Sequence, residues 1–339
     1  MASEASGVAN RNLQITLKSR PQGWVRESDF AFVEAPLPRP GPGEALLRTL
    51  YLSLDPYMRG RMDEAKSYAK NVEIGEVMVG GTVSEVVESN IAGLDAGQLV
   101  VSSAGWQQYS KTNGQGLMRV PAGLPPSIFL GPAGMPGVTA WIGLFDIGQP
   151  KAGETVVVSA ASGAVGSVVG QLAKEQGCRV IGVAGGPEKC AYVTGELGFD
   201  ACIDYKRDGW IQEFRNATPD GIDVDFENVG GEVLDNVLKR CNTHARIAIC
   251  GLIAGYNATE PMALANLRSI LVNRVRMQGF FVSDHLPRWP EIIRELTGRV
   301  AAGKLRYRET IAQGLESAPK AFIGLLKGEN FGKQLVKVA

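Results

Sequence analysis

The segment that decides the fold is Thr155-Val-Val-Val-Ser-Ala-Ala-Ser-Gly-Ala-Val-Gly-Ser-Val-Val-Gly-Gln-Leu-Ala-Lys174, in which a β-branched run, a turn of small residues and an apolar helical stretch follow one another. The turn has the pattern AxGxxG, with Ala161, Gly163 and Gly166 at the three positions of the fingerprint GxGxxG. In that fingerprint the glycines let the backbone approach a pyrophosphate and the helix pack closely, and the helix N-terminus faces the negative charge. Because a strand precedes the turn and a helix follows it, dinucleotide binding is favoured over a tight turn without a ligand.

Outward from this turn, the second half of the chain alternates short apolar runs with helix-length segments. This alternation predicts βαβ units and an α/β fold with a doubly wound parallel sheet covered on both faces. We expect strands at residues 155–159, 179–184, 222–226, 246–250 and 275–281, and helices at 166–176, 187–197 and 232–241.

The first part of the chain, up to about residue 130, has a different rhythm. Short apolar alternations are broken by turn signals, such as the Pro- and Gly-rich residues 36–43, which precede an expected strand at 44–53. These patterns predict an all-β domain. Near the C-terminus, Pro319 and Gly332 bracket a last helix, and residues 334–338 are expected to form one more strand.

Composition excludes several classes of function. The 339 residues include 35 Lys plus Arg against 35 Asp plus Glu, so the chain lacks the basic excess that is typical of nucleic-acid-binding proteins. No run of eighteen apolar residues predicts a membrane span, and the start, Met1 to Ser6, does not resemble a secretion signal. We therefore expect a soluble cytoplasmic protein of about two domains.

Cysteine and histidine are too sparse and too widely spaced for a zinc site to be expected. The chain has only two histidines, His244 and His285, and none of its cysteines form a CxxC pair. The chemistry is therefore expected to come from an organic cofactor. The five cysteines are Cys178, Cys190, Cys202, Cys241 and Cys250.

The residues after the second expected strand bear on the choice between NAD and NADP. An NAD site usually places an acidic residue at the end of this strand, whereas residues 183–186 contain none. Small residues leave room for a 2′-phosphate, which Lys189, Tyr205 and Arg207 could contact. Glu188 would repel that phosphate, and spacing alone describes Lys189 equally well as a solvated helix residue.

Seven segments, in matching order along nearly the whole chain, resemble one known family. They are LDPYMRGRM (54–62), GMPGVTAW (134–141), SAASGAVG (159–166), AGGPEK (184–189), FENVGG (226–231), CGLIAGYN (250–257) and NFGK (330–333). The family is the zinc-independent medium-chain reductases of alkenals and enones, which include plant 2-alkenal double-bond reductases, prostaglandin reductases (leukotriene hydroxydehydrogenases) and bacterial curcumin reductase.

This resemblance implies a GroES-like β domain from residues 1–130 and 311–339, a Rossmann NADPH-binding domain from residues 131–310, and a homodimer. It also implies no metal, because zinc-containing relatives carry Cys and His ligands in segments that match residues 54–56 and 75–76, which have none here. The cofactor-binding residues it implies are Pro56, with Tyr57 beside it in the cleft; Ala164, Val165 and Gly166 at the pyrophosphate; Gly185, Lys189 and Tyr205 at the 2′-phosphate; and Asn228, Cys250, Tyr256, Phe280, Phe281, Val282 and Asn330 at the nicotinamide.

The activity implied is NADPH-dependent reduction of the carbon–carbon double bond of a small enal or enone. Hydride reaches the β carbon, so the protein must align the reactants and place hydrogen-bond donors where the enolate charge develops. We assign Tyr256 to the carbonyl oxygen or the proton relay and Tyr57 to substrate positioning, with water or a ribose hydroxyl as other proton sources. The alternatives are an NADPH:quinone reductase of the same superfamily and a catalytically silent NADPH-binding protein.

Several other side chains have two interpretations. Met58, Trp106, Met135, Phe281 and Trp289 could line an apolar cleft, although each one alone is better explained as core. Arg59 and Arg61 could reach an anion or form structural ion pairs. Cys250, at the end of a buried strand, is expected to be a packed thiol.

Overall fold

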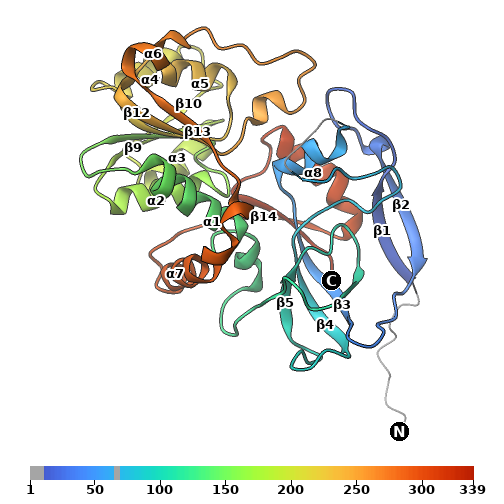
Figure 1. Ribbon diagram of the computed structural model, residues 1–339. Coiled ribbons are helices and arrows are strands. Elements are labelled where there is room, and N and C mark those ends of the chain that lie inside the picture. The colour runs from blue at the N-terminus through green and yellow to red at the C-terminus, as the bar shows by residue number, and fades with distance from the viewer. Residues whose placement is uncertain (1–10, 65–68) are drawn as a thin grey trace.

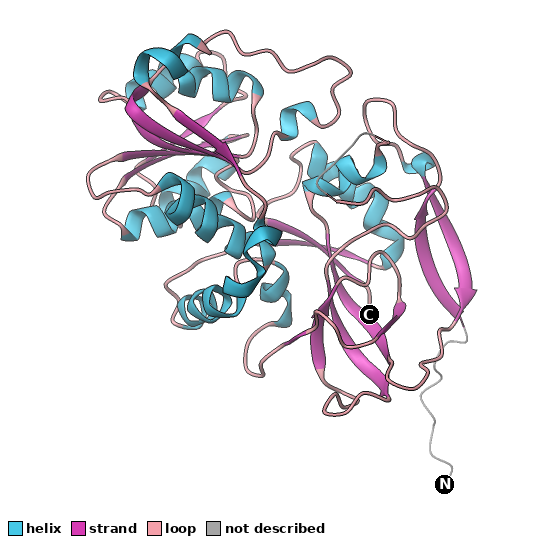
Figure 2. Cartoon of the chain, in the orientation of Figure 1, coloured by secondary structure: helices cyan, strands magenta, loops and turns pink. Residues whose placement is uncertain are grey.

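The structure, a computed structural model, describes residues 11–64 and 69–339 and divides into two lobes (Figure 1). One lobe holds a six-stranded parallel sheet between helices. The other holds a seven-stranded, mainly antiparallel sheet and a separate two-stranded ribbon (Figure 2). No helix within the described ranges is long and apolar enough to cross a membrane.

The parallel sheet has the strand order β10-β9-β8-β11-β12-β13, which confirms the doubly wound α/β fold. Its order reverses next to β8, the strand that leads into the AxGxxG turn. The strands are β8 (Thr155–Ser159), β9 (Arg179–Ala184), β10 (Ala201–Asp204), β11 (Ile222–Glu227), β12 (Cys241–Ile249) and β13 (Arg276–Gly279).

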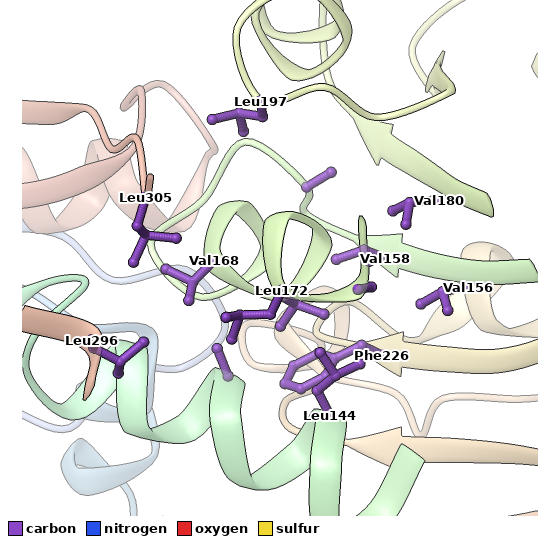
Figure 3. Packing of buried hydrophobic residues seen from close by; sticks show 14 of the residues in the cluster. Leu144, Val156, Val158, Val168, Leu172, Val180, Leu197, Phe226, Leu296 and Leu305 are labelled. Carbon is purple, nitrogen blue, oxygen red and sulfur yellow. The ribbon is translucent and has the colours of Figure 1, made fainter. Parts of the chain in front are cut away.

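Both faces of this sheet are buried. Val156 and Val158 of β8 pack in one cluster with Val168 and Leu172 of the helix that follows (Figure 3). Val157, between them, belongs to the core on the opposite face. Two-sided burial explains the unbroken β-branched run, because neither face can be polar. The first face is covered by α1 (Met135–Ile142), α2 (Gly166–Glu175), α3 (Pro187–Gly195) and α7 (Trp289–Ala301), and the second by α4 (Trp210–Ala217), α5 (Gly231–Leu238) and α6 (Arg268–Asn273).

The largest differences from the expected element boundaries lie between α5 and β12, whereas the other expected elements shift by at most two residues. The helix expected over 232–241 ends at Leu238, and the strand expected from 246 already begins at Cys241. Cys241 pairs with Ile222, and a register shift then separates this pair from the rest of the ladder. The long-range pairing of Cys241 with β11 therefore overrides the local helical pattern.

The antiparallel sheet contains strands from both parts of the chain. Its order is β14-β15-β3-β4-β5-β7, and β6 also pairs with β3. The strands are β3 (Ala45–Ser53), β4 (Thr82–Ser89), β5 (Leu99–Ser102), β6 (Tyr109–Thr112), β7 (Met118–Arg119), β14 (Glu309–Gln313) and β15 (Lys333–Lys337); β1 (Arg11–Leu17) and β2 (Phe30–Pro36) form the ribbon.

The aromatic centre of this lobe is Trp106, which is fully buried. Its ring stacks on Phe30 with centroids 5.3 Å apart and meets Phe322 edge-on at 5.7 Å. Phe322 belongs to α8 (Ala318–Leu326), which connects β14 to β15 along the chain. Met58 lies in the same cluster, so Trp106 and Met58 are core residues rather than cleft residues.

Two carboxyl groups are fully buried on one face of β11. Asp225 and Glu227 are two residues apart, and within the described chain neither oxygen of Asp225 has a hydrogen-bond partner. Burial, and then the neighbouring Glu227, raises the pKa of Asp225. Burial also raises the pKa of Glu227. The protonated form of Asp225 is therefore the one that this core accepts.

We expect the free energy of unfolding to decrease as pH rises, and Asp225→Asn to reduce this dependence. A carboxyl whose folded-state pKa lies above its unfolded value of about 3.9 stabilises the fold fully at low pH, and this contribution is lost as pH rises through the folded-state pKa. Urea unfolding between about pH 5 and about pH 8 measures the slope. The exposed Asp208→Asn is the control. Equal slopes for wild type and Asp225→Asn would contradict the assignment.

Candidate active site

The candidate site lies at the carboxyl end of the parallel sheet, where the strand order reverses between β8 and β11. The connection after β8 leads to β9 on one side, and the connection after β11 leads to β12 on the other. The crevice between two such diverging connections is the usual place for a ligand in an open α/β sheet. Ser159 ends β8, and Glu227 ends β11 beside it.

The AxGxxG turn brings two stretches of backbone into contact. A Cβ added to Gly166 would lie 2.5 Å from the carbonyl oxygen of Ala160, and one added to Gly163 would lie 3.1 Å from the same atom. Ala160 itself has a positive φ of 49°. The turn is therefore closed to side chains at both glycine positions, while Ala164 and Val165 stay half-buried at the start of α2. This geometry fits a pyrophosphate against the helix N-terminus.

A segment near the C-terminus reaches this turn. Gly163 forms a parallel bridge with Gly332, and Asn330 Nδ2 donates to the Gly332 carbonyl oxygen at 2.8 Å. Gly332 has a φ of 71°, and a Cβ there would lie 1.9 Å from the Arg308 carbonyl oxygen. The structure therefore places Asn330 beside the predicted pyrophosphate turn.

The residues predicted for the 2′-phosphate gather after β9 and β10. A Cβ on Gly185 would lie 3.1 Å from the hydroxyl of Tyr205 and 2.9 Å from Lys206 Cε. Burial, and then the charge of Lys206, lowers the pKa of Lys189. Two lysine side chains thus repel each other beside a tyrosine hydroxyl, which is the chemistry of an anion site. Lys189 Nζ also donates to the Gly328 carbonyl oxygen at 2.6 Å.

Two further residues, Lys206 and Asp204, contribute to this cluster and were not predicted from the sequence. Lys206 was overlooked in favour of Arg207, whose guanidinium instead lies 3.6 Å from Glu213. Asp204 is buried and accepts hydrogen bonds from the backbone N–H of Gly186 and Lys206, which fixes both loops. In the sequence, the order Asp204-Tyr-Lys206 directly after a strand was the signal that could have indicated these two residues.

On the opposite side of the turn, Ser159 and Glu227 hold the loop that carries Asn228. Ser159 Oγ donates to Glu227 Oε1 at 2.6 Å and accepts from Asn228 N at 2.7 Å. The same Glu227 oxygen accepts from Val229 N and Gly230 N, and Asn228 Nδ2 donates to the Ser159 carbonyl oxygen. The sequence analysis named Asn228 but missed the two buried residues that position it.

The remaining residues predicted at the nicotinamide differ in exposure. Cys250 N donates to the Glu227 carbonyl oxygen at 2.9 Å, and burial raises the pKa of its thiol to about 12, as expected for a packed cysteine. Phe280 packs edge-on against Phe226, so its ring belongs to the core. Phe281 is 46% exposed, and Val282 is half-buried.

Pro56 and Tyr57 begin the 3₁₀ helix η2 (Pro56–Met62). The preceding Asp55 is buried and accepts a hydrogen bond from Lys333 Nζ at 2.6 Å, and this amine also donates to the Leu54 carbonyl oxygen. Because Lys333 directly follows Gly332, the start of η2 is tied to the segment that touches the AxGxxG turn.

Tyr256 follows η5 (Ile253–Gly255), a 3₁₀ turn after β12. Its hydroxyl oxygen accepts from Leu252 N at 3.4 Å. The next residue, Asn257, accepts from Arg59 Nε at 3.1 Å. This buried bond joins η2, which begins with Pro56 and Tyr57, to the loop of Tyr256, so the structure brings the two segments together. Arg59 also forms an ion pair with Asp63. Of its two predicted roles, anion binding or a structural ion pair, the structure shows the ion pair.

Within residues 11–64 and 69–339, no three His, Cys, Asp or Glu side chains are grouped so that they could hold a metal ion.

The chain matches two protein families. Residues 13–120 match the family described as the N-terminal domain of oxidoreductase, and residues 164–298 match the family described as zinc-binding dehydrogenase.

Curated relatives match over nearly their full length. The NADPH-dependent curcumin reductase of Escherichia coli (strain K12) is 50% identical, over 97% of both chains. Prostaglandin reductase 1 of Rattus norvegicus is 44% identical, over 95% of this chain and 98% of the relative. The 2-alkenal reductase (NADP(+)-dependent) of Nicotiana tabacum is 41% identical, over 100% and 99%. These matches confirm the resemblance drawn from the seven segments.

Among solved structures, CurA from Vibrio vulnificus in complex with NADPH has a TM-score of 0.92 and 50% identity. The match covers 96% of this chain and 99% of that chain.

We expect Gly166→Ala to destabilise the protein by about 1–3 kcal/mol, because its methyl group would overlap the Ala160 carbonyl oxygen and force the backbone apart. Thermal unfolding measures the loss. The matched control is Gly298→Ala within α7, where a Cβ meets nothing within 4 Å. That change should stabilise the protein by about 0.5–1 kcal/mol through helix propensity. Equal effects of both changes would show that the close approach is unimportant.

Proposed function

This chain belongs to the medium-chain dehydrogenase/reductase family, in the branch of the curcumin, prostaglandin and 2-alkenal reductases, and we propose that it reduces the carbon–carbon double bond of α,β-unsaturated aldehydes and ketones with NADPH. The observation that carries this function is the near-full-length identity of 41–50% with three such reductases.

Two features of the site support NADPH as the cofactor. The AxGxxG turn holds Gly163 and Gly166 so close to the Ala160 carbonyl oxygen that neither position has room for a side chain, and the turn leads into the N-terminus of α2, where a pyrophosphate would bind. Lys189 and Lys206 supply positive charge beside Tyr205, where a 2′-phosphate would be neutralised.

In the proposal, residues 131–310 form the NADPH-binding domain, and residues 1–130 with 311–339 form the β domain. Residues 1–10 and 65–68 of that β domain lie outside the described ranges.

When bound, NADPH supplies the hydride that the β carbon of the substrate receives. The protein must then stabilise the negative charge that develops on the carbonyl oxygen. In our proposal the hydroxyl of Tyr256, whose oxygen accepts from Leu252 N, donates a hydrogen bond to the substrate's carbonyl oxygen. Tyr57 positions the substrate from the opposite lobe.

Other residues in this proposal act by positioning. The buried pair of Asp55 and Lys333 fixes the start of η2 and therefore Tyr57. Ser159 and Glu227 fix the loop of Asn228 in the same way. The pKa of the Cys250 thiol, raised to about 12, keeps it protonated at neutral pH and leaves it no nucleophilic role.

We also propose that the protein is cytoplasmic and forms a homodimer. Helix α6, which precedes the edge strand β13, supports the dimer, because the helix and the residue before it leave apolar side chains in solvent. Leu271 is 80% exposed, and Leu267 and Val272 are more than half exposed. A second copy of the chain is a partner that would cover this surface.

The function is tested by NADPH oxidation with short alkenals, cyclic enones, long conjugated ketones and quinones, with NADH as the control cofactor. Product analysis by mass spectrometry should show a saturated carbonyl compound. A quinol as the only reduced product would identify a quinone reductase instead. NADPH binding without oxidation by any substrate of the panel would identify a catalytically silent binding protein.

We expect Tyr256→Phe to lower kcat with an enone by about ten- to a thousand-fold, the range for a lost transition-state donor. The dissociation constant for NADPH, measured by fluorescence, should change little because the aromatic ring remains. An unchanged kcat would remove Tyr256 from the mechanism and favour water or the ribose hydroxyl as the donor.

We expect Lys206→Met to raise the KM for NADPH by about ten-fold, because one charge-assisted hydrogen bond to the 2′-phosphate is lost. The KM for NADH should stay the same, since NADH has no 2′-phosphate. The matched control is Arg207→Met, because Arg207 pairs with Glu213 and should affect neither cofactor. Equal changes in the two KM values for Lys206→Met would place Lys206 outside the phosphate site.

A further inference from the structure

Two of the five cysteines lie in contact beside the predicted 2′-phosphate site. Cys190 is on helix α3 and Cys202 is on strand β10, which α3 packs against. The two thiols are joined by a side-chain hydrogen bond, and both residues are half-buried. Cys202 Sγ lies 3.3 Å from the position that a Cβ on Gly182 would take, so its place beside β9 is closely packed.

The pair differs chemically from the other thiols. The hydrogen bond from Cys202 lowers the pKa of Cys190, whereas the same contact and burial raise the pKa of Cys202. Burial raises the pKa of Cys178 to about 11 and that of Cys241 and Cys250 to about 12. Cys190 is therefore the thiol that forms a thiolate most readily, and its neighbour is a second sulfur.

Both cysteines are built into the elements that form the phosphate cluster. Cys190 directly follows Lys189, and its backbone N–H donates to the Gly186 carbonyl oxygen at 3.2 Å. Cys202 lies two residues before Asp204, which accepts from Gly186 N at 2.8 Å. A change in the spacing of α3 and β10 must therefore change the spacing of Lys189 and Tyr205.

We propose that Cys190 and Cys202 form a redox-sensitive thiol pair, and that its oxidation to a disulfide weakens NADPH binding. A disulfide joins the sulfurs at about 2.05 Å, which is shorter than any hydrogen-bond contact, so α3 and β10 must move. The effect on NADPH rests on the proposed function, whereas disulfide formation does not.

The oxidant is a peroxide, and the reaction balances with hydrogen peroxide. The Cys190 thiolate attacks one peroxide oxygen, the O–O bond breaks, and a sulfenic acid and one water form. The Cys202 sulfur then attacks the Cys190 sulfur, the S–OH bond breaks, and a second water leaves. Two thiols are oxidised to one disulfide, one peroxide is reduced to two waters, and the thiol hydrogens end in the waters.

Binding linkage adds an independent consequence. If the disulfide lowers the affinity for NADPH, bound NADPH must by the same factor oppose disulfide formation at equilibrium. We expect the thiol–disulfide equilibrium of the pair to shift toward the two thiols when NADP⁺, which carries the same 2′-phosphate, is present at saturation.

The disulfide is tested on the full-length protein by peptide mass spectrometry. No Lys or Arg lies between the two cysteines, so trypsin releases both on the peptide of residues 190–206. After treatment with hydrogen peroxide and alkylation of the remaining thiols, this peptide should be unalkylated and lighter by two hydrogens. A dithiol reductant should restore two alkylation sites. Oxygen added to Cys190 with Cys202 still alkylated would overturn the pair.

The coupling is tested with three variants. Oxidised wild type should bind NADP⁺ about ten-fold more weakly by isothermal titration, the effect of one lost charge-assisted contact, and reduction should reverse it. After peroxide, Cys190→Ser and the independent Cys202→Ala should bind NADP⁺ as tightly as they did before treatment. The buried control Cys178→Ala should lose affinity as wild type does. A disulfide that leaves the affinity of wild type unchanged would reject the coupling, and normal enone reduction by the reduced protein would show that the proposed function still stands.

Discussion

The arrangement of the candidate site depends on one contact between backbones, the bridge between Gly163 in the AxGxxG turn and Gly332 before the last strand. Neither backbone has room for a larger residue, since a Cβ on Gly163 would lie 3.1 Å from the Ala160 carbonyl oxygen and one on Gly332 would lie 1.9 Å from that of Arg308. Two turns that are far apart in sequence can approach each other here because both lack side chains. The contact joins the lobe that holds the parallel sheet to the lobe that holds β15.

From this contact, two polar connections extend to the two tyrosines. Lys333, next to Gly332, binds Asp55 in a buried ion pair at the start of η2. Arg59, farther along η2, binds Asn257 next to Tyr256. Breaking a buried charged pair by removing one partner costs far more than its net contribution to stability, so such pairs fix geometry strongly. The segments that carry Tyr57 and Tyr256 are thus positioned by charged side chains to which the proposed reaction assigns no chemical step.

Sequence reasoning found the residues that belong to recognisable motifs and missed those that act through space. The strand–turn–helix pattern located the AxGxxG turn, and the strand tip without an acid pointed to a phosphate. Lys206 was missed because its proximity to Lys189 depends on β10 lying next to β9. Glu227 was named only within a motif, because nothing in its neighbours indicates that a carboxylate accepts hydrogen bonds from Ser159, Val229 and Gly230 at once.

The sequence by itself determined the α/β class, the doubly wound sheet and the family, because hydrophobic period and glycine spacing act over a few residues and are legible locally. Only the tertiary structure decided which side chains share the site. It placed Trp106 and Met58 in the core, gave Arg59 a structural partner and set Cys190 against Cys202. Such contacts depend on the packing of distant elements, and that packing is a property of the whole fold rather than of any one segment.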